Sequence, residues 1–484
     1  MNKSTVIIIG TGFGGQCAAI NLLKQGIDDF VMLERRGFMG GTWCQNTYPG
    51  AAVDVQSPLY SLSFEPYKWS QMFAEQSELE EYTNHVIEKY QLRDKAVLNT
   101  NVEEIRWDED VNQWKVQTSN GEFVSQFLIN ASGPLSTPVI PNFKGKDTFN
   151  GESFHTNNWN QNYDYKNKRV AIIGSGASAA QVIPAIAPDV KKLHVFQRTP
   201  HWVLPRADKK FSSFQRKLLG VNFIHKLVRW MIYWGLETRV VGFKYSKFFL
   251  KLIGQREAEN FIKKSIKDEE LRKKVTPDFT LGCKRVLLSN TLYPTYEEEN
   301  VSLHVKDEGV QEITESGIIT KDGQLIKLDL IVYATGYDAT DGAISYPVYG
   351  KQNLKLQDFW NPFPRAYLGT SIPKFPNLFI VTGPNTGIGH TSAIFIIEAQ
   401  MHYMMKSIKQ VLSKNAKSIE VKHDSEEEYT NMIHSEMEQT VWKSGGCNSW
   451  YQSKSGHIVA MFPGFSFTYL RMAKNFKPNH HIIN

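Results

Sequence analysis

Two glycine-rich loops with the same spacing stand out in the chain. The first, at residues 10–15, reads GTGFGG, and the second, at residues 174–179, reads GSGASA. In this pattern the glycines permit a tight turn and a close approach of the backbone to a pyrophosphate, while the N-terminus of the following helix supplies positive potential. The two loops could therefore hold two dinucleotides.

The strands that follow the two loops end in side chains of different charge. The first ends at Glu34, at the distance where a carboxylate receives ribose hydroxyls, and the second ends at Gln197, Arg198 and Thr199. A guanidinium in that place can pair with a 2′-phosphate that a carboxylate would repel, although Arg198 could also be an ordinary surface arginine. We therefore assign the first loop to FAD and the second to NADPH. The predicted FAD contacts in the first unit are Gly10, Gly12, Phe13, Gly15, Glu34 and Arg35, and the predicted NADP contacts in the second are Gly174, Ser175, Gly176, Ser178, Ala179, Arg198 and Thr199.

Each loop needs a strand before it and a helix after it. A β-branched run begins at Val6, a helix is expected over residues 16–25 and a second strand over 30–34; the same order returns as a strand from Arg169, a helix over 177–187 and a strand over 193–197. These βαβ units predict an α/β fold with two Rossmann-like dinucleotide-binding domains. We expect residues 1–145 to form the first part of the FAD-binding domain, 146–330 the NADP-binding domain with a helical insertion at about 209–274, and 331–484 the second part of the FAD-binding domain, with a long helix near 392–412.

The composition is that of an ordinary globular protein. The 484 residues are 41% hydrophobic and 21% charged, and the net charge of +6 arises without a long Lys/Arg run, so nothing indicates nucleic-acid binding. Cys17, Cys44, Cys283 and Cys447 lie far apart and form no CxxC pair, which predicts neither a metal site nor a disulfide and favours a reducing, cytoplasmic location. No signal peptide and no apolar run of membrane-spanning length is visible.

The predicted insertion contains a basic, aromatic segment. Residues 221–254 hold six basic residues and one acid, Glu237. A basic amphipathic face can rest on a membrane surface, but it can equally be a solvated helix face whose other side lies in the core. We favour the second interpretation, because flanking helices should cover the apolar side.

Several ordered motifs resemble those of class B flavoprotein monooxygenases, and specifically Baeyer–Villiger monooxygenases. Residues 149–160, FNGESFHTNNWN, resemble the fingerprint FxGxxxHxxxW followed by Pro or Asp; Trp159 favours the Baeyer–Villiger branch over the flavin-containing monooxygenases, and Asn160 departs from the pattern. Further matches are GGTW at 40–43, YPGAAVD at 48–54, KR at 284–285, ATGY at 334–337, GPN at 383–385 and SWY at 449–451. Ala52 and Val53 stand where the family has Arg-Cys. We expect His155, inside the fingerprint, to order a linker between the domains rather than to act as an acid or base.

The resemblance implies roles for further residues. FAD contacts are implied for Gly41, Thr42, Trp43, Asp54, Val55, Tyr60 and Val102, and NADP contacts for Lys284 and Trp450. Arg285 and Asp54 are the candidate catalytic residues: Arg285 supplies a fixed positive charge, and Asp54 pairs with it and orients it. Lys284 should point elsewhere, because neighbouring side chains on an extended strand alternate.

The activity implied by the resemblance is the NADPH- and O2-dependent oxygenation of a small-molecule ketone to an ester or lactone through a C4a-peroxyflavin. Three alternatives remain open at this stage: a flavin-containing monooxygenase that oxidises sulfur or nitrogen in small molecules such as thioethers, a flavin-dependent reductase, and a non-catalytic nucleotide-binding protein. The missing CxxC disfavours a disulfide reductase.

Overall fold

The β-branched run near the N-terminus forms strand β1 (Asn2–Ile9), which lies inside a mixed sheet. The computed structural model describes residues 2–342 and 344–484, and within them this sheet has eight strands in the order β17-β4-β5-β6-β1-β2-β3, with β18 beside β6. Ile7 pairs in parallel with Val31 on one side and Leu128 on the other, and it is fully buried, as expected for a strand covered on both faces. The other strands are β2 (Phe30–Leu33), β3 (Ala96–Val97), β4 (Val102–Asp108), β5 (Gln113–Thr118), β6 (Gly121–Asn130), β17 (Val348–Tyr349) and β18 (Leu378–Ile380).

The second glycine loop belongs to a separate parallel sheet. In the described chain its strand order is β12-β9-β8-β16-β7, and every pairing between these strands is parallel. The strands are β7 (Glu152–His155), β8 (Arg169–Ile173), β9 (Lys192–Phe196), β12 (Val301–His304) and β16 (Leu330–Tyr333). Smaller pairings join β13 (Val310–Thr314), β14 (Gly317–Thr320) and β15 (Leu325–Lys327), then β10 (Val203–Leu204) and β11 (Leu287–Leu288), and finally β19 (Ile419–Val421) and β20 (His481–Ile483). The predicted α/β class is confirmed.

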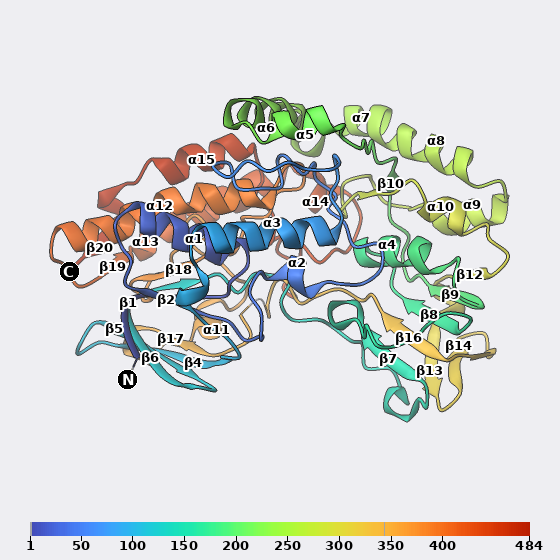
Figure 1. The fold of residues 1–484 in the computed structure, drawn as a ribbon, viewed down its shortest axis with the longest axis horizontal. Coiled ribbons are helices and arrows are strands. Elements are labelled where there is room, and N and C mark those ends of the chain that lie inside the picture. The colour runs from blue at the N-terminus through green and yellow to red at the C-terminus, as the bar shows by residue number, and fades with distance from the viewer. Residues whose placement is uncertain (1, 343) are drawn as a thin grey trace.

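Helices cover both sheets (Figure 1). Helix α1 (Phe13–Lys24) follows the first loop and packs with α12 (Ala393–Ser413) in one apolar core, so the last third of the chain closes over the first. Helix α4 (Ala177–Ile186) follows the second loop. The remaining helices outside the insertion are α2 (Thr42–Gln45), α3 (Gln76–Lys89), α10 (Leu292–Thr295), α11 (Leu356–Phe359), α13 (His423–Met437), α14 (Val441–Ser444) and α15 (Ser466–Lys474).

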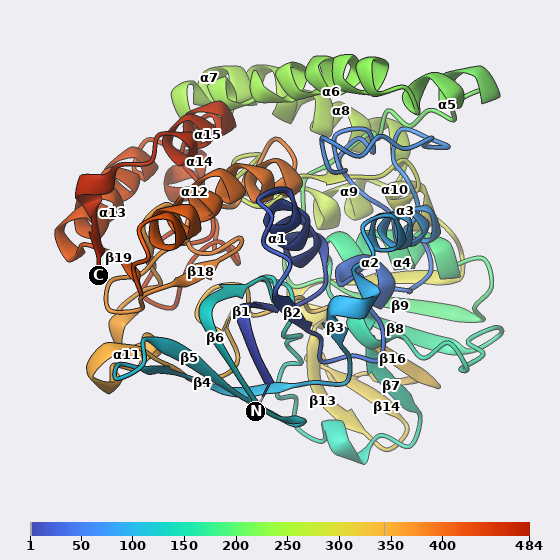
Figure 2. The same ribbon diagram turned by 60° about the vertical axis from the view of Figure 1, so that its left-hand side comes forward.

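The predicted insertion is helical and lies along one edge of the molecule. It comprises α5 (Ser213–Leu219), α6 (Asn222–Glu237), the π-helical segment η4 (Val241–Tyr245), α7 (Lys247–Phe249), the π-helical segment η5 (Leu250–Gln255), α8 (Arg256–Ser265) and α9 (Glu269–Val275). Figure 2 shows α5, α6 and α7 in a row at this edge, with no other helix outside them. The expectation that flanking helices cover the apolar side is therefore wrong, since Phe223 and Trp230 are exposed. No helix in the described ranges is both long enough and apolar enough to cross a bilayer.

The structure joins Cys283 to Cys447 in a disulfide, so the prediction of no disulfide is also wrong. The two residues are 164 positions apart, and their Cα atoms lie 6.1 Å apart. They meet because the segment before Cys283 is hydrogen-bonded to the loop after α14, with the Thr280 amide donating to the Gly445 carbonyl at 3.0 Å. Rules based on cysteine spacing recognise pairs that are close in sequence, so they cannot predict a disulfide between two cysteines that only the tertiary structure brings together.

Candidate active site

The first glycine loop forms an open cradle at the N-terminus of α1. Gly10 has φ +94°, and a Cβ there would lie 2.6 Å from the carbonyl oxygen of Ala131; a Cβ on Gly15 would lie 2.0 Å from the Gly10 carbonyl oxygen. These two positions admit only glycine. A Cβ on Gly12 would meet nothing nearer than 3.5 Å, and no side chain caps the helix that starts there. The space and the free helix-end amides fit a phosphate.

The side chains predicted around this cradle are close together. Glu34 follows the last residue of β2 and is buried, and it accepts hydrogen bonds from the Thr11 amide at 3.2 Å and the Thr11 hydroxyl at 2.7 Å. These bonds hold the first glycine loop in place. Trp43 donates from its indole to the Tyr60 hydroxyl at 3.1 Å, and Phe13 packs edge-on against Tyr60. The other predicted contacts here lie on the same side: Gly41 faces Gly12, Thr42 begins α2, and Arg35 donates to the Ser136 carbonyl at 2.9 Å.

The second loop repeats the cradle beside a pair of cations. Gly174 has φ +130°, and a Cβ there would lie 2.2 Å from the Ala334 carbonyl oxygen, whereas a Cβ on Gly176 would meet nothing within 4 Å. Burial and the charge of Arg198 both lower the pKa of Lys284, so the two basic side chains lie near each other. Neither takes part in an ion pair among the described residues. Two like charges without a protein carboxylate at contact distance fit an anionic ligand between them.

The remaining predicted residues of the second unit surround this loop. The Ser175 hydroxyl donates to the Thr199 carbonyl at 2.8 Å, Ser178 lies beside Tyr48, and Ala179 is a buried residue of α4. Lys284 and Arg285 have different partners, as expected. They do not lie on a strand, however, because β11 begins only at Leu287.

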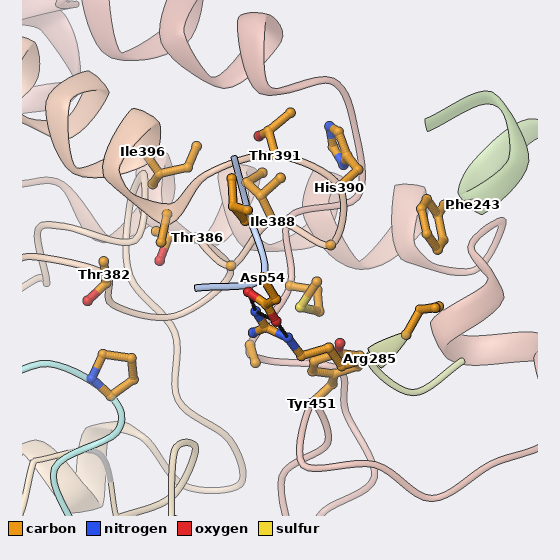
Figure 3. Close-up of a pocket in the computed structure, with 18 of the residues that line it drawn as sticks. Asp54, Phe243, Arg285, Thr382, Thr386, Ile388, His390, Thr391, Ile396 and Tyr451 are labelled. Carbon is orange, nitrogen blue, oxygen red and sulfur yellow. Dashed lines mark hydrogen bonds and ion pairs between the residues drawn. The ribbon is translucent and has the colours of Figure 1, made fainter. Parts of the chain in front are cut away.

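Arg285 and Asp54 form the predicted charged pair. Arg285 donates from Nε to Asp54 Oδ2 at 2.9 Å and from Nη2 to Asp54 Oδ1 at 2.5 Å, which makes the contact bidentate. The neighbouring carboxylate raises the pKa of Arg285 further above its ordinary value, so the guanidinium stays charged at every working pH. Figure 3 shows the two side chains in direct contact in the wall of the pocket, with Tyr451 beside Arg285. Burial raises the pKa of Tyr451 to about 12, so its hydroxyl is neutral.

The segment that carries Asp54 is pinned between the two nucleotide units. Tyr48 donates from its hydroxyl to Gln181 on α4 at 2.9 Å, and Gln181 in turn donates to the Ala52 carbonyl at 2.8 Å. Buried Val53 fixes the backbone next to Asp54. The disulfide adds a second restraint, because Cys283 lies two residues before Arg285.

A cavity of about 940 Å³ lies between the two units, and Asp54, Val55, Arg285 and Trp450 belong to its wall. Most of the lining is apolar and comes from segments far apart in sequence. The insertion contributes Leu236, Val241, Phe243, Phe249, Leu250 and Ile253, and the loop before α12 contributes Thr382, Thr386, Ile388, His390 and Thr391. Sequence reasoning missed these residues. They belong to no motif, and the aromatic density of residues 221–254 was the only available signal.

His155 and Val102 belong neither to the glycine loops nor to the cavity wall. His155 ends β7, where its Nδ1 accepts the Asn157 amide at 3.0 Å and its ring meets Tyr337 edge-on. Burial lowers the pKa of His155 to about 4, so the ring is neutral at pH 7. This placement supports an ordering role. Val102 packs in the core with Leu33, and its FAD contact stays a prediction.

Two nucleotide cradles, together with a cavity whose wall holds a fixed arginine, define a flavoprotein oxidoreductase of the two-dinucleotide-binding class. A family model described as pyridine nucleotide-disulphide oxidoreductase matches residues 7–217. The chain is 41% identical to a Baeyer–Villiger monooxygenase of Pseudomonas aeruginosa, over 97% of this chain and 90% of that protein, and 38% identical to one of Streptomyces coelicolor, over 96% and 90%. It is similar to the closed crystal structure of a cyclohexanone monooxygenase, with a TM-score of 0.88 and 26% identity over 100% of this chain and 99% of that one. It also resembles an oxidised steroid monooxygenase bound to NADP, with a TM-score of 0.89 and 27% identity over 100% and 99%. The chain belongs to the Baeyer–Villiger monooxygenase family.

Proposed function

We propose that the protein uses NADPH and O2 to convert a ketone into an ester or lactone, with FAD on the first glycine loop and NADP on the second. The observation that carries this proposal is the bidentate Arg285–Asp54 pair in the wall of the large apolar cavity. Solved relatives in complex with FAD and NADP, of the same fold over nearly their whole length, support the choice of cofactors.

The residues present fit both cofactors. The Gly12 and Gly176 positions leave room for a pyrophosphate at a helix N-terminus, and Arg198 and Lys284 offer positive charge to a 2′-phosphate. When bound, reduced flavin supplies the activation of dioxygen. The work of the protein is to orient the ketone, exclude water and hold fixed charge where an anion develops.

Arg285 supplies that fixed charge. A ketone carbonyl that is attacked in the cavity gains negative charge on its oxygen, and a guanidinium held in advance stabilises this charge without reorganisation. Asp54 occupies two of the Arg285 donors and so fixes the plane of the group. The remaining N–H groups can point into the cavity. Asp54 is therefore a positioning residue in this proposal, and Arg285 is the catalytic one.

The lining of the cavity favours an apolar ketone. The insertion side of the wall is built from aliphatic and aromatic side chains such as Phe243 and Leu250, which offer burial rather than hydrogen bonds. Burial of apolar substrate surface contributes roughly 25 cal/mol per Å². A ketone with a large hydrocarbon body therefore suits this cavity better than a small polar one.

The test is Arg285→Ala in the FAD-loaded enzyme. Losing one preorganised charge that faces a developing anion costs about 10²–10³ in rate. Ester formation should fall by that factor, while stopped-flow absorbance still shows flavin reduction by NADPH and the consumed NADPH appears as hydrogen peroxide. Arg285→Lys should restore little, because lysine lacks the planar fork.

A matched control is Arg169→Ala. Arg169 also makes a bidentate pair, with Asp329 at 3.0 and 2.6 Å, but it does not line the cavity. This variant loses the same kind of ion pair and should still form ester at close to the parental rate. The role of Arg285 would be refuted if folded, FAD-loaded Arg285→Ala enzyme also formed ester at close to the parental rate. Ketone oxygenation would be refuted if the only products were sulfoxides or N-oxides.

A further inference from the structure

Helix α6 is amphipathic, but its large apolar side chains face outward, whereas an ordinary surface helix turns them towards the core. Its buried side chains are three polar ones, His225, Arg229 and Glu237, and one apolar one, Leu236. Its outward face carries Phe223, Leu227, Trp230, Met231 and Trp234, with exposed fractions of 75, 46, 60, 52 and 42%. A helix in contact with water alone places its apolar stripe against the core. The outward face of α6 therefore has the side chains of a surface that something other than water covers.

Polar contacts fasten the inward face to the rest of the protein. Arg229 donates to the carbonyl oxygens of Pro58 and Ser61 at 2.8 and 2.7 Å and lies 3.7 Å from the Glu398 carboxylate. Glu237 accepts the Ser466 amide at 2.6 Å and hydroxyl at 2.8 Å. Because these bonds fix the rotation of α6, the helix cannot turn its apolar face inward without breaking them. The exposure is built into the fold.

The apolar surface continues along the same edge of the molecule. Beyond α6, the exposed large side chains are Phe214 on α5, Val241 and Tyr245 on η4, Phe248 and Phe249 on α7, Leu252 and Ile253 on η5, and Phe467 on α15. Figure 2 shows α5, α6 and α7 in a row along this edge. We call these residues and the outward face of α6 the apolar edge. A contiguous exposed patch of this extent marks an interaction surface.

The apolar edge is basic from α5 to η5, and the next exposed acid along the chain is Glu257 on α8. Between residues 209 and 256 the only acid is Glu237, which is buried. The exposed bases include Arg216, Lys217, Lys226, Lys251 and Arg256. Lys226 lies three residues after Phe223 and four before Trp230, so it shares their face of the helix. Exposed apolar and aromatic side chains interleaved with bases, without exposed acids, match the interface of an anionic bilayer.

We propose that the apolar edge is a docking surface for an anionic lipid bilayer, which the protein binds peripherally. A second copy of this chain fits poorly, because a two-fold contact through this edge would bring bases against bases with no exposed acid in the segment to pair with them. The edge also borders the cavity, since Phe249 and Ile253 line the cavity and are 52 and 64% exposed. Docking would place that wall of the cavity at the bilayer.

The experiment is flotation of the FAD-loaded protein with phosphatidylcholine vesicles, with or without an equal share of phosphatidylglycerol. The wild type should float with the anionic vesicles, and less so at high salt. The variant Phe223→Ser/Leu227→Ser/Trp230→Ser should bind at least about a hundredfold more weakly, since full burial of each side chain contributes on the order of tenfold. Lys217→Gln/Lys226→Gln should weaken binding to the anionic vesicles alone, by roughly fivefold per charge.

A matched control is Val111→Ser/Leu325→Ser/Leu412→Ser, which removes three exposed apolar side chains away from the apolar edge and should float like the wild type. None of these substituted residues lines the cavity, so FAD content and ketone turnover report folding separately from vesicle binding. The proposal is overturned if the wild type floats with neither kind of vesicle. It is also overturned if the apolar-edge and control variants lose binding alike, or if sedimentation equilibrium shows self-association that only the apolar-edge variant abolishes while vesicles stay unbound.

Discussion

Removing the positive charges beside the second glycine loop should abolish the preference for NADPH over NADH. Arg198 and Lys284 lie near enough for Arg198 to lower the pKa of Lys284, and the charge of a 2′-phosphate would relieve this repulsion. NADH has no such phosphate. The substitutions Arg198→Ala and Lys284→Ala should therefore weaken NADPH binding and leave NADH binding nearly unchanged.

The expected loss of NADPH binding free energy for each substitution depends on how exposed the side chain is to solvent. A hydrogen bond to a charged group contributes about 1.5–3 kcal/mol, and exposed Arg198 should fall at the lower end because solvent screens it. About 1.5 kcal/mol corresponds to roughly tenfold in binding. Half-buried Lys284 should come close to the upper end, which is roughly a hundredfold.

Calorimetric titration with 2′,5′-ADP measures the phosphate contact without turnover, and steady-state KM values for NADPH and NADH measure the preference. Lys191→Ala, which removes an exposed base just before β9, is the control and should change neither quantity. The assignment of the second loop to NADP fails if the two substitutions raise KM for NADH as much as for NADPH, or if affinity for 2′,5′-ADP stays at the wild-type value.

Two further outcomes can be checked directly. Gly176→Ala should fold and retain FAD, because a Cβ there meets no protein atom within 4 Å, but it should raise KM for NADPH because the methyl group occupies space that the pyrophosphate needs. Gly235→Ala is equally unobstructed and should leave KM for NADPH unchanged. Equal KM values for the two variants would count against a pyrophosphate site at Gly176. Burial lowers the pKa of His225 to about 4, so its ring takes up a proton more readily in the unfolded chain than in the folded protein. The free energy of unfolding should therefore decrease as the pH falls from about 6.5 towards 4, by about 1.4 kcal/mol per pH unit for one proton. His225→Leu should reduce the fall of Tm in this interval, and an unchanged fall would show that this ring is not the titrating group.

Local patterns in the sequence were sufficient for the two nucleotide units. Hydrophobic periodicity and glycine spacing act over about 30 residues, so β1, α1, β2 and their counterparts β8, α4 and β9 could be predicted to within a few residues of their ends. The charge contrast between Glu34 and Arg198 lies inside these same units. Family motifs added the pairing of Arg285 with Asp54, which no local rule predicts, because 231 residues separate them.

The tertiary structure decided the features that depend on which distant segments become neighbours. The disulfide exists because the segment before Arg285 meets the loop after α14, and the cavity wall combines the insertion with the loop before α12. The clearest case is α6, whose periodicity shows one apolar and one polar face without showing which face is turned inward. Arg229 and Glu237 find buried partners in segments 168 and 229 residues away, and these bonds, rather than the hydrophobic pattern, set the rotation of the helix.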